Sequence, residues 1–475
     1  MKKRFLSLLL IMSMLFTVLP AGNVFAQEEE GPYSLWAMED LIVGDTYGIY
    51  PQAWYTRGMQ KPITHAQTRV LISGLRLKLL NTERVIDSDD IQYRFNNNIT
   101  VEDVLDAFYR TLLAYELDGD IGITDNGNAV DYMAGNGIFT GHEGELSLKD
   151  TCTVEQACVI ATRLVTHLYD ALDAASKGFL WEINSGENKV YLLGSVHMAN
   201  HDIYPFGNKM LKAFAESDVL GVELDMINGS IDANMLLMQY GVYDDGTTLK
   251  DHVSEETYQK TVQVAANFGY TEEMISMFKP WAIFTMFSSV TNSTSASIEE
   301  TAMAASLGID LKFTVDAYMT GKPIVELEGY ELQINMLASF SDELAEYLLD
   351  GTMDSIIGLL QGESATGNDV MTVILDYWHK GDVEGFMNDI APLLVASELP
   401  EEMEEEDNAI QVLMDEYYNK LFTERDKGMA EKIDLFLKGE GSTTYFVVVG
   451  TGHYISEYSV IDILEEMGYE VNQVK

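Results

Sequence analysis

The chain has 475 residues, of which 47% are hydrophobic, so it is long and apolar enough for two or three domains with real cores. Its formal net charge of −47 at pH 7 excludes nucleic acid and anionic membranes as partners, because like charges repel. Its two cysteines, Cys152 and Cys158, exclude a disulfide framework and a cysteine-based zinc site, and we expect them to stay unpaired.

The first 26 residues have the pattern of a secretory signal peptide. Lys2-Lys3-Arg4 precede an apolar run from Phe5 to Leu19, and Val24-Phe25-Ala26 supplies small residues for cleavage. Removal of residues 1–26 deletes three cations and no anions, which gives a mature net charge of −47 − 3 = −50. No later apolar stretch reaches the roughly 18 residues that a membrane span needs. We therefore expect a secreted or extracellular protein without a transmembrane segment in the mature chain.

Residues 33–172 contain a weak threefold repeat of helix, loop and helix. The second helix of each copy is predicted to begin at a threonine followed by acidic or amide residues, which favour a helix start. These starts read Thr64-His-Ala-Gln67, Thr100-Val-Glu-Asp103 and Thr153-Val-Glu-Gln156. The pattern predicts an all-helical N-terminal domain.

The threefold pattern resembles the S-layer homology module of bacterial cell-surface proteins. That family carries a Thr-Arg-Ala-Glu signature at the start of the second helix and binds secondary cell-wall polymer through it. The arginine is missing from all three copies here, although a guanidinium is the natural partner of an anionic polymer. Two alternatives stay open, a domain attached to cell-wall polymer and a helical domain that only packs on its neighbours.

From residue 178 to residue 475 the sequence changes to strands alternating with helices, which is typical of an α/β domain. Residues 179–183 and 189–196 are predicted to form a hairpin, and further strands are expected at 219–225, 323–328 and 446–450. Long helical insertions are expected within 230–310 and 330–439. We therefore predict a central, mostly parallel sheet with flanking helices.

Two of these strands end in the same short motif, Gly-x-x-His. Tyr191-Leu-Leu-Gly-Ser-Val-His197 and Phe446-Val-Val-Val-Gly-Thr-Gly-His453 are apolar on both faces, as central parallel strands are. Open α/β sheets place their ligands at the carboxyl edge of the strands. We therefore expect His197 and His453 to meet at one rim.

Charged residues at the ends of the other strands are the remaining candidates for the site. Glu223 follows the strand that begins at residue 219, and Glu326 and Glu328 end the strand that begins at 323. Arg425 falls on the apolar stripe of a predicted helix, where a buried cation needs an anionic partner. It is either a structural ion pair to a strand carboxylate or an anchor for a substrate carboxylate or oxyanion.

Several motifs in register make residues 178–475 resemble the TraB/GumN family. They occur in the order and rough spacing of that family and read Tyr191-Leu-Leu-Gly-Ser-Val-His-Met198, Tyr204-Pro205, Val222-Glu-Leu-Asp225, Lys279-Pro-Trp281, Gly308-Ile-Asp310, Gly321-Lys-Pro323, Leu327-Glu328, Glu424-Arg425 and Val449-Gly-Thr-Gly-His-Tyr454. The residue after Glu424-Arg425 is aspartate where many members have asparagine, a difference that we expect to matter little. The family is similar to the Tiki metal-dependent proteases and looks related in fold to the erythromycin esterase-like and ChaN-like proteins.

The resemblance implies a metal-dependent hydrolase, most simply a peptidase acting on peptides or proteins. By position, His197, Glu223 and His453 would be the metal ligands, and imidazole with carboxylate suits manganese, cobalt or zinc. Glu328 or Glu326 could then act as general base, and Arg425 could hold an oxyanion. The alternative is a protein that binds or sequesters a pheromone-like peptide in the same cleft without cleaving it.

Overall fold

The computed structural model describes residues 32–474 apart from 83–92, 94, 96–97, 116, 118–120, 126, 142–144, 292–297, 363–365, 391–404 and 457. The predicted signal peptide, residues 1–26, therefore lies outside the described residues. The described chain falls into two compact units. The N-terminal unit holds the described residues up to Ser176 together with His201–Asn208, and the C-terminal unit holds Lys177–Asn200 and Lys209 onwards.

The N-terminal unit is helical, as predicted. Its main helices are α2 (Met38–Tyr47), α3 (His65–Leu80), α4 (Val101–Leu113), α5 (Ala129–Gly135) and α6 (Val154–Ala171), with 3₁₀ turns at Leu35–Ala37, Gln52–Arg57 and His201–Ile203. Cys152 and Cys158 are both buried and unpaired, which confirms that prediction.

Helices α3, α4 and α6 begin with the same capping box. In each, the threonine side chain accepts the backbone N–H three residues later, and the side chain of that later residue accepts the N–H of the threonine. The pairs are Thr64 with Gln67, Thr100 with Asp103 and Thr153 with Gln156. The segments before these helices also join one another, because Ile63 N–H donates to Cys152 O at 2.9 Å and Cys152 N–H donates to Ile99 O at 3.0 Å. The repeat in the sequence is therefore a repeat of local structure.

The C-terminal unit is built on a six-stranded sheet of order β4-β3-β5-β2-β1-β6. Its strands are β1 (Phe179–Ser185), β2 (Asn188–Ser195), β3 (Val219–Val222), β4 (Ile324–Glu326), β5 (Thr444–Gly450) and β6 (Asn472–Gln473). Strands β4, β3, β5 and β2 run parallel, whereas β1 is antiparallel to β2 and to β6. The predicted hairpin and the mostly parallel sheet are confirmed.

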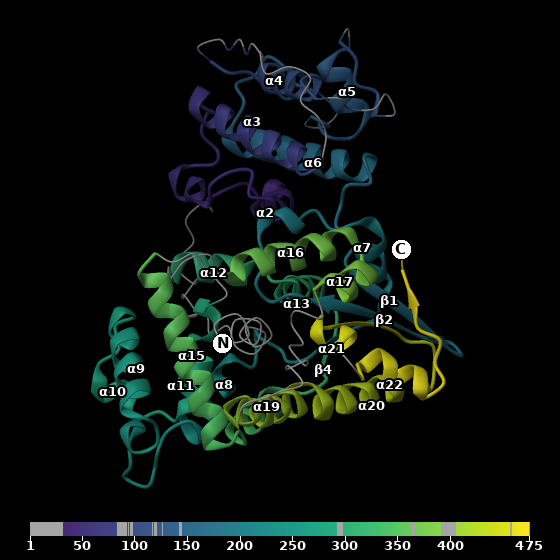
Figure 1. The fold of residues 1–475 in the computed structure, drawn as a ribbon. Coiled ribbons are helices and arrows are strands. Elements are labelled where there is room, and N and C mark those ends of the chain that lie inside the picture. Colours follow the sequence, from purple (N-terminus) through teal and green to yellow (C-terminus); the bar gives the residue numbers. More distant parts are fainter. Residues whose placement is uncertain are drawn as a thin grey trace. The chain divides into compact units, whose positions relative to one another are not determined.

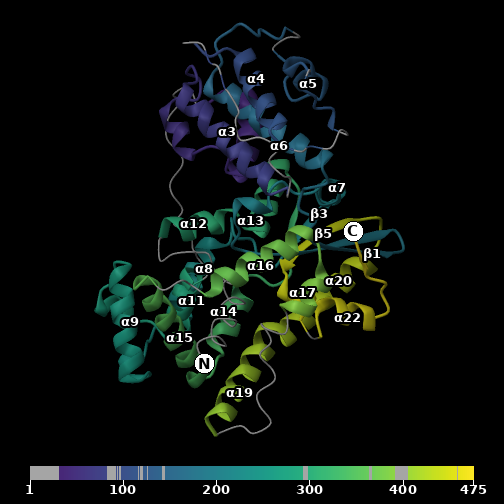
Figure 2. The ribbon, with the colours of Figure 1, turned by 45° about the horizontal axis from the view of Figure 1, so that its top comes forward.

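Helices flank this sheet and also form a separate group beside it (Figures 1 and 2). The group at the left of Figure 1, with α9, α10, α11 and α15, shares an apolar core that includes Phe284 and Leu349. The remaining helices of the unit are α7 (Asn208–Glu216), α8 (Ser230–Tyr240), α9 (Glu255–Asn267), α10 (Glu272–Ser276), α11 (Pro280–Thr291), α12 (Ile298–Ser306), α13 (Ile309–Thr320), α14 (Tyr330–Ala338), α15 (Asp342–Leu360), α16 (Thr366–Lys380), α17 (Val383–Asp389), α19 (Glu405–Tyr418), α20 (Glu424–Lys438), α21 (Gly452–Ile455) and α22 (Val460–Glu466).

Two predicted strands are shorter than expected. The strand predicted over 219–225 ends at Val222, and the strand predicted over 323–328 covers only Ile324–Glu326. Beyond these points one carbonyl, that of Glu223, accepts two N–H groups, those of Glu328 and Gly329, so the ladder closes there. Gly329 has φ +87°, a conformation that glycine adopts readily, and it turns the chain into α14. Glu223 and Glu328 therefore lie just past the edge of the sheet.

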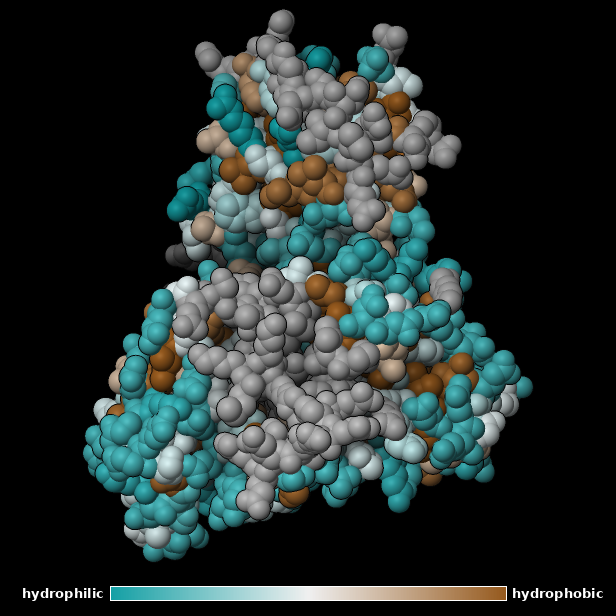
Figure 3. All heavy atoms as spheres, viewed as in Figure 1, coloured by the Kyte–Doolittle hydropathy of each residue, from teal (hydrophilic) through white to brown (hydrophobic). Residues whose placement is uncertain are grey.

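The surface agrees with the composition. On the face seen in Figure 3 the described residues are mostly hydrophilic, with apolar side chains in separate small groups. Within the described ranges, no helix combines the length and the apolar character that crossing a membrane requires.

Candidate functional site

The carboxyl ends of neighbouring parallel strands bring the predicted residues to one rim. On β2 and β5, Ser195 pairs with Gly450, so His197 and His453 follow the two strands almost in step. Strand β3 pairs with the other side of β5, and Glu223 follows its last residue. The two histidines therefore follow neighbouring strands at the same edge of the sheet, as expected, and their joint role in a site stays a prediction.

His197 is held by a residue that sequence reasoning did not assign to the site. Its Nδ1 donates to Asp310 Oδ2, and Asp310 lies in the first turn of α13. The helix can come this close because residue 308 is glycine. A Cβ at Gly308 would lie 2.3 Å from the carbonyl oxygen of His197. His197 Nε2 is buried and has no hydrogen-bond partner among the described atoms.

His453 has the same kind of support from a different helix. Its Nδ1 donates to Asp426 Oδ1, and Ser456 donates to the other oxygen of that carboxylate. The ring of Phe422 packs on His453 with centroids 5.2 Å apart. Phe422 belongs to a π-helical turn, Asn419–Thr423, that leads into α20, and such turns are frequent at functional sites. The Asp426 carboxylate therefore orients His453, and the expectation that aspartate in place of asparagine matters little stays a prediction.

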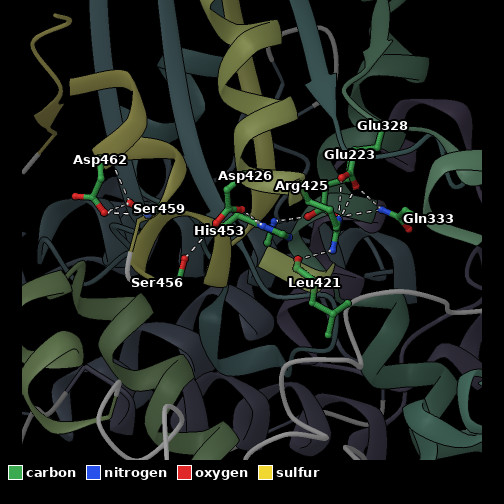
Figure 4. A network of polar contacts seen from close by, with 11 residues as sticks. Glu223, Glu328, Gln333, Leu421, Arg425, Asp426, His453, Ser456, Ser459 and Asp462 are labelled. Atoms are coloured by element: carbon green, nitrogen blue, oxygen red, sulfur yellow. Dashed lines mark hydrogen bonds and ion pairs between the residues drawn. The ribbon is translucent and has the colours of Figure 1, made fainter. Parts of the chain in front are cut away.

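Arg425 joins two of the predicted carboxylates in a buried network (Figure 4). Its Nε and Nη2 donate to Glu328 at 2.8 and 2.7 Å, and Nη2 also donates to Glu223 Oε2 at 2.7 Å. Its Nη1 donates to the carbonyl of Leu421. Gln333 Nε2 bridges the same carboxylates, with 2.9 Å to Glu328 and 3.3 Å to Glu223. Of the two alternatives for Arg425, the structure shows the ion pair to strand carboxylates.

The network keeps Glu223 ionised. Burial raises the pKa of Glu223, but the charges of Arg425, His453 and His197 lower it to about 2. The N–H of Gly450 also donates to Glu223 Oε1 at 2.6 Å. Glu223, the third predicted ligand, is therefore held as a carboxylate.

The two candidate general bases, Glu328 and Glu326, lie in different environments. Glu328 has a side chain that is 3% exposed and lies beside Glu223 within the network of Arg425. Glu326 is exposed, and its Oε1 accepts the backbone N–H of Asp225 at 2.7 Å. The two glutamates were expected to share one face of a strand, but their environments differ because the chain leaves the sheet after Glu326.

The two imidazoles fit a divalent metal ion by their chemistry. In the part of the chain that the structure describes, no three His, Cys, Asp or Glu side chains are gathered closely enough to hold an ion as they stand. Each histidine, however, gives its Nδ1–H to a carboxylate, which is the usual outer partner of a metal-binding histidine, and the unpaired Nε2 of His197 is a free ligand atom. Glu223 Oε1 accepts the N–H of Gly450 and so keeps a lone pair for an ion.

Three residues of the site were missed as participants. Asp310, Asp426 and Gln333 support the histidines and carboxylates from helices: Asp310 is 113 residues from His197, Asp426 is 27 residues from His453, and Gln333 is 110 residues from Glu223. The signal that could have found the two aspartates is their place in the quoted motifs, directly after Gly308-Ile and Glu424-Arg425.

A family model described as the TraB/PrgY/gumN family matches residues 179–473. The chain belongs to this family. The matched range contains all the strands, both histidine motifs and the network of Arg425. The predicted resemblance of this part of the chain is therefore confirmed, together with its α/β fold.

Curated relatives have two kinds of description. The chain is 31% identical over 170 residues to the uncharacterized protein YbaP of Escherichia coli, a stretch that covers 35% of this chain and 58% of YbaP. It is 26% identical over 103 residues to a metalloprotease TIKI homolog of Nematostella vectensis, or 22% of each chain. Over 324 residues it is 23% identical to metalloprotease TIKI1 of Danio rerio, which covers 62% of each chain. The chain thus spans somewhat more than half of YbaP, and no solved structure matches it.

Proposed function

We propose that the C-terminal unit is a metal-dependent hydrolase that acts on peptides or proteins. The observation that carries this proposal is the pair of histidines at the ends of adjacent parallel strands, each with its Nδ1 on a buried aspartate. The similarity to proteins described as TIKI metalloproteases supports the same reaction class.

In this proposal His197 and His453 hold the ion through Nε2, and Glu223 is the third ligand. A bound divalent ion, for which manganese, cobalt and zinc are the candidates, polarises a carbonyl group and makes a water molecule more acidic. Asp310 and Asp426 keep the proton of each imidazole on Nδ1, so the lone pair of Nε2 stays available.

Glu328 is the better placed of the two candidate bases. It lies beside Glu223, whereas Glu326 is exposed and bonded to backbone. Arg425 places one positive charge between two buried carboxylates, which offsets their mutual repulsion. We therefore assign to Arg425 the role of holding Glu223 and Glu328 in place. To Glu328 we assign the transfer of a proton at its carboxylate oxygen.

The test is a peptide library incubated with the purified protein and read by mass spectrometry. We expect cleavage with Mn²⁺, Co²⁺ or Zn²⁺ and loss of cleavage with a chelator. His197→Ala and His453→Ala should abolish cleavage and keep the circular dichroism spectrum, while His252→Ala, outside the site, should cleave as the wild type does. If the protein binds peptides saturably but leaves their mass unchanged with every metal, the proposed hydrolysis is contradicted and the alternative function, peptide sequestration, takes its place.

We further propose that residues 1–26 export the protein and that the N-terminal unit is an S-layer homology-like module. The three matching capping boxes support a repeat of this kind. A secreted protein with such a module would be attached to secondary cell-wall polymer, even though the arginine of the signature is absent. Retention of the mature protein on purified cell-wall sacculi tests this, and failure to be retained leaves a helical unit with a packing role only.

A further inference from the structure

The edge strand β4 leads directly into the network of Arg425. In the order β4-β3-β5-β2-β1-β6 it stands at one end of the sheet and pairs with β3. Of the described helices and strands, β3 is also its main neighbour. Glu328, which pairs with Arg425, follows the last residue of β4 by two positions. One side of β4 is therefore an edge of the sheet, and this edge ends at the candidate site.

Every second residue of β4 turns its backbone groups away from β3. The carbonyl of Pro323 accepts an N–H of β3 at 2.9 Å, and Leu327 N–H donates to a carbonyl of β3 at 2.7 Å. In a parallel ladder, alternate residues of a strand give both N–H and C=O to the same neighbour, so Val325, midway between these two, also faces β3. The N–H and C=O groups of Ile324 and Glu326 therefore point to the free edge.

These outward groups are available to a partner. Among the described atoms, Ile324 N–H, Ile324 C=O and Glu326 N–H have no hydrogen-bond partner, and Glu326 C=O accepts the Nζ of Lys432 at 3.3 Å. Ile324 and Val325 point to opposite faces of the sheet, yet both are partly exposed, as expected where no further strand covers the edge. Unpaired N–H and C=O groups on an edge strand are a template for another extended chain.

The free edge lies within reach of the two histidines. Glu223, His453 and His197 follow β3, β5 and β2, so the middle of this set lies near the end of β5. Neighbouring strands are about 4.8 Å apart, which puts a strand added to β4 about 14 Å from that point. An extended chain spans about 3.4 Å per residue, so about four residues bridge this distance.

We propose that the free edge of β4 binds an extended segment of the peptide substrate as a further strand of the sheet, about four residues from the bond that is cleaved. Main-chain hydrogen bonds to Ile324 and Glu326 hold the segment, so this contact accepts many sequences. The inference rests on the proposed function, since it names how the same site takes its substrate.

A peptide fits this edge better than a second copy of the chain does. Strand β4 has 3 residues, and short edge strands resist pairing between whole proteins. Each copy also carries a formal net charge of −47, so two copies repel each other. A peptide without excess negative charge meets no such repulsion and needs only the outward groups of Ile324 and Glu326.

Site-resolved hydrogen exchange of the free protein tests the edge itself. The amides of Ile324 and Glu326 should exchange at least about tenfold faster than those of Val325 and Leu327, because only the latter two are bonded within the ladder. Equal protection of all four amides would mean that the edge is already covered, and it would overturn the inference.

The binding test uses a peptide selected on the full-length protein in chelator, so that turnover plays no part. A library of blocked peptides of about twelve residues, long enough to pair with β4 and to reach the histidines, is passed over the immobilised protein. The most strongly retained peptide is the probe, and each of its residues is N-methylated in turn. Fluorescence anisotropy should show losses of about tenfold or more at two positions, i and i+2, and of less than about twofold at i+1, because the carbonyls of Ile324 and Glu326 are two residues apart.

A change in the protein tests the same pairing from the other side. Ile324→Pro removes an outward N–H and keeps the ladder with β3, since proline is tolerated on an edge strand where its missing N–H faces outward. It should weaken binding of the probe about tenfold or more, because the ring also obstructs the incoming strand. The matched control, Ile324→Ala, shortens the same side chain, keeps the N–H and should bind the probe within about twofold of the wild type. Circular dichroism shows whether both variants fold, and the N-methyl pattern decides alone if the proline variant does not.

No retained peptide, N-methyl losses without the i, i+2 pattern, or equal binding of the probe by Ile324→Pro and Ile324→Ala would overturn the inference. A dimer in analytical ultracentrifugation that Ile324→Pro dissociates would overturn it as well, because a second copy would then fill the edge. Patterned binding without cleavage under any metal would contradict only the proposed hydrolysis. Cleavage of the probe at equal rates by Ile324→Pro and Ile324→Ala would contradict only the role of the edge.

Discussion

Replacing Arg425 by methionine tests the buried network most directly. Methionine keeps the apolar length of the side chain and removes the charge. The side chains of Arg425, Glu223 and Glu328 are 4%, 7% and 3% exposed, so two carboxylates would remain buried without their cation. Removing one partner of a buried ion pair costs about 3–5 kcal/mol. We expect a loss of that size in the free energy of unfolding at pH 7.

The pH dependence of this loss follows from Glu223. In the wild type the pKa of Glu223 in the folded state, about 2, lies below its ordinary value of 4.5, so the contribution of Glu223 to stability is present above pH 4.5 and is lost as the pH falls toward 2. In the variant, burial acts without the strongest opposing charge, so the folded pKa rises. A folded state with the higher pKa binds protons more tightly and gains stability as the pH falls. The gap between variant and wild type should therefore shrink from pH 7 to about pH 4.

Urea unfolding of the full-length protein in chelator, followed by tryptophan fluorescence and circular dichroism, measures both effects. The control is Lys260→Met in the same unit, because Lys260 pairs with Asp350, Asp354 and Glu256, whose side chains are 34%, 50% and 77% exposed. Surface ion pairs contribute about 0–1 kcal/mol, so the control should lose no more than that. An Arg425→Met variant within about 1 kcal/mol of the wild type at pH 7, or a gap that does not shrink in acid, would refute the reasoning.

Three other changes probe the site. In the wild type, acidification from about pH 4.5 to pH 2 should lower the free energy of unfolding by about 3 kcal/mol through Glu223, since one pKa unit corresponds to about 1.4 kcal/mol. Glu223→Gln should lack this acid-dependent loss, and unfolding measured across an acid titration checks the difference. Gly308→Ala would place its Cβ 2.3 Å from His197 O, so the loop must move, and we expect at least about a tenfold loss of metal affinity and about 1–3 kcal/mol of stability. Asp426→Ala should lower metal affinity by about 10–100-fold by calorimetry, and Asp426→Asn by less, because an amide oxygen still accepts from His453.

Each of these has its own contrary outcome. An unchanged acid profile in Glu223→Gln would mean that its charge is not held by the fold. Gly428→Ala is the control for the glycine, since nothing lies within 4 Å of its Cβ, and equal behaviour of the two alanine variants would remove the steric argument for Gly308. Equal metal affinity of wild type and Asp426→Ala would show that the orientation of His453 does not depend on its carboxylate.

The sequence by itself determined the features that depend on near neighbours in the chain. Each capping box joins residues three apart, so Thr64, Thr100 and Thr153 could be recognised as helix starts without a fold. The position of His197 and His453 at the carboxyl edge of the sheet was also predictable, because apolar runs of strand length imply buried parallel strands and the glycines fix where each run ends.

Only the tertiary structure decided which groups hold those histidines. Asp310 is 113 residues from His197 in the sequence, and Arg425 is 202 residues from Glu223, so their contacts depend on how α13 and α20 pack on the sheet. The difference between Glu326 and Glu328 has the same origin. Alternation along a strand would give them one environment, but the strand ends at Glu326, and the Glu328 side chain, 3% exposed, pairs with Arg425. Local rules describe the strand, and the packing of distant helices determines the chemistry at its end.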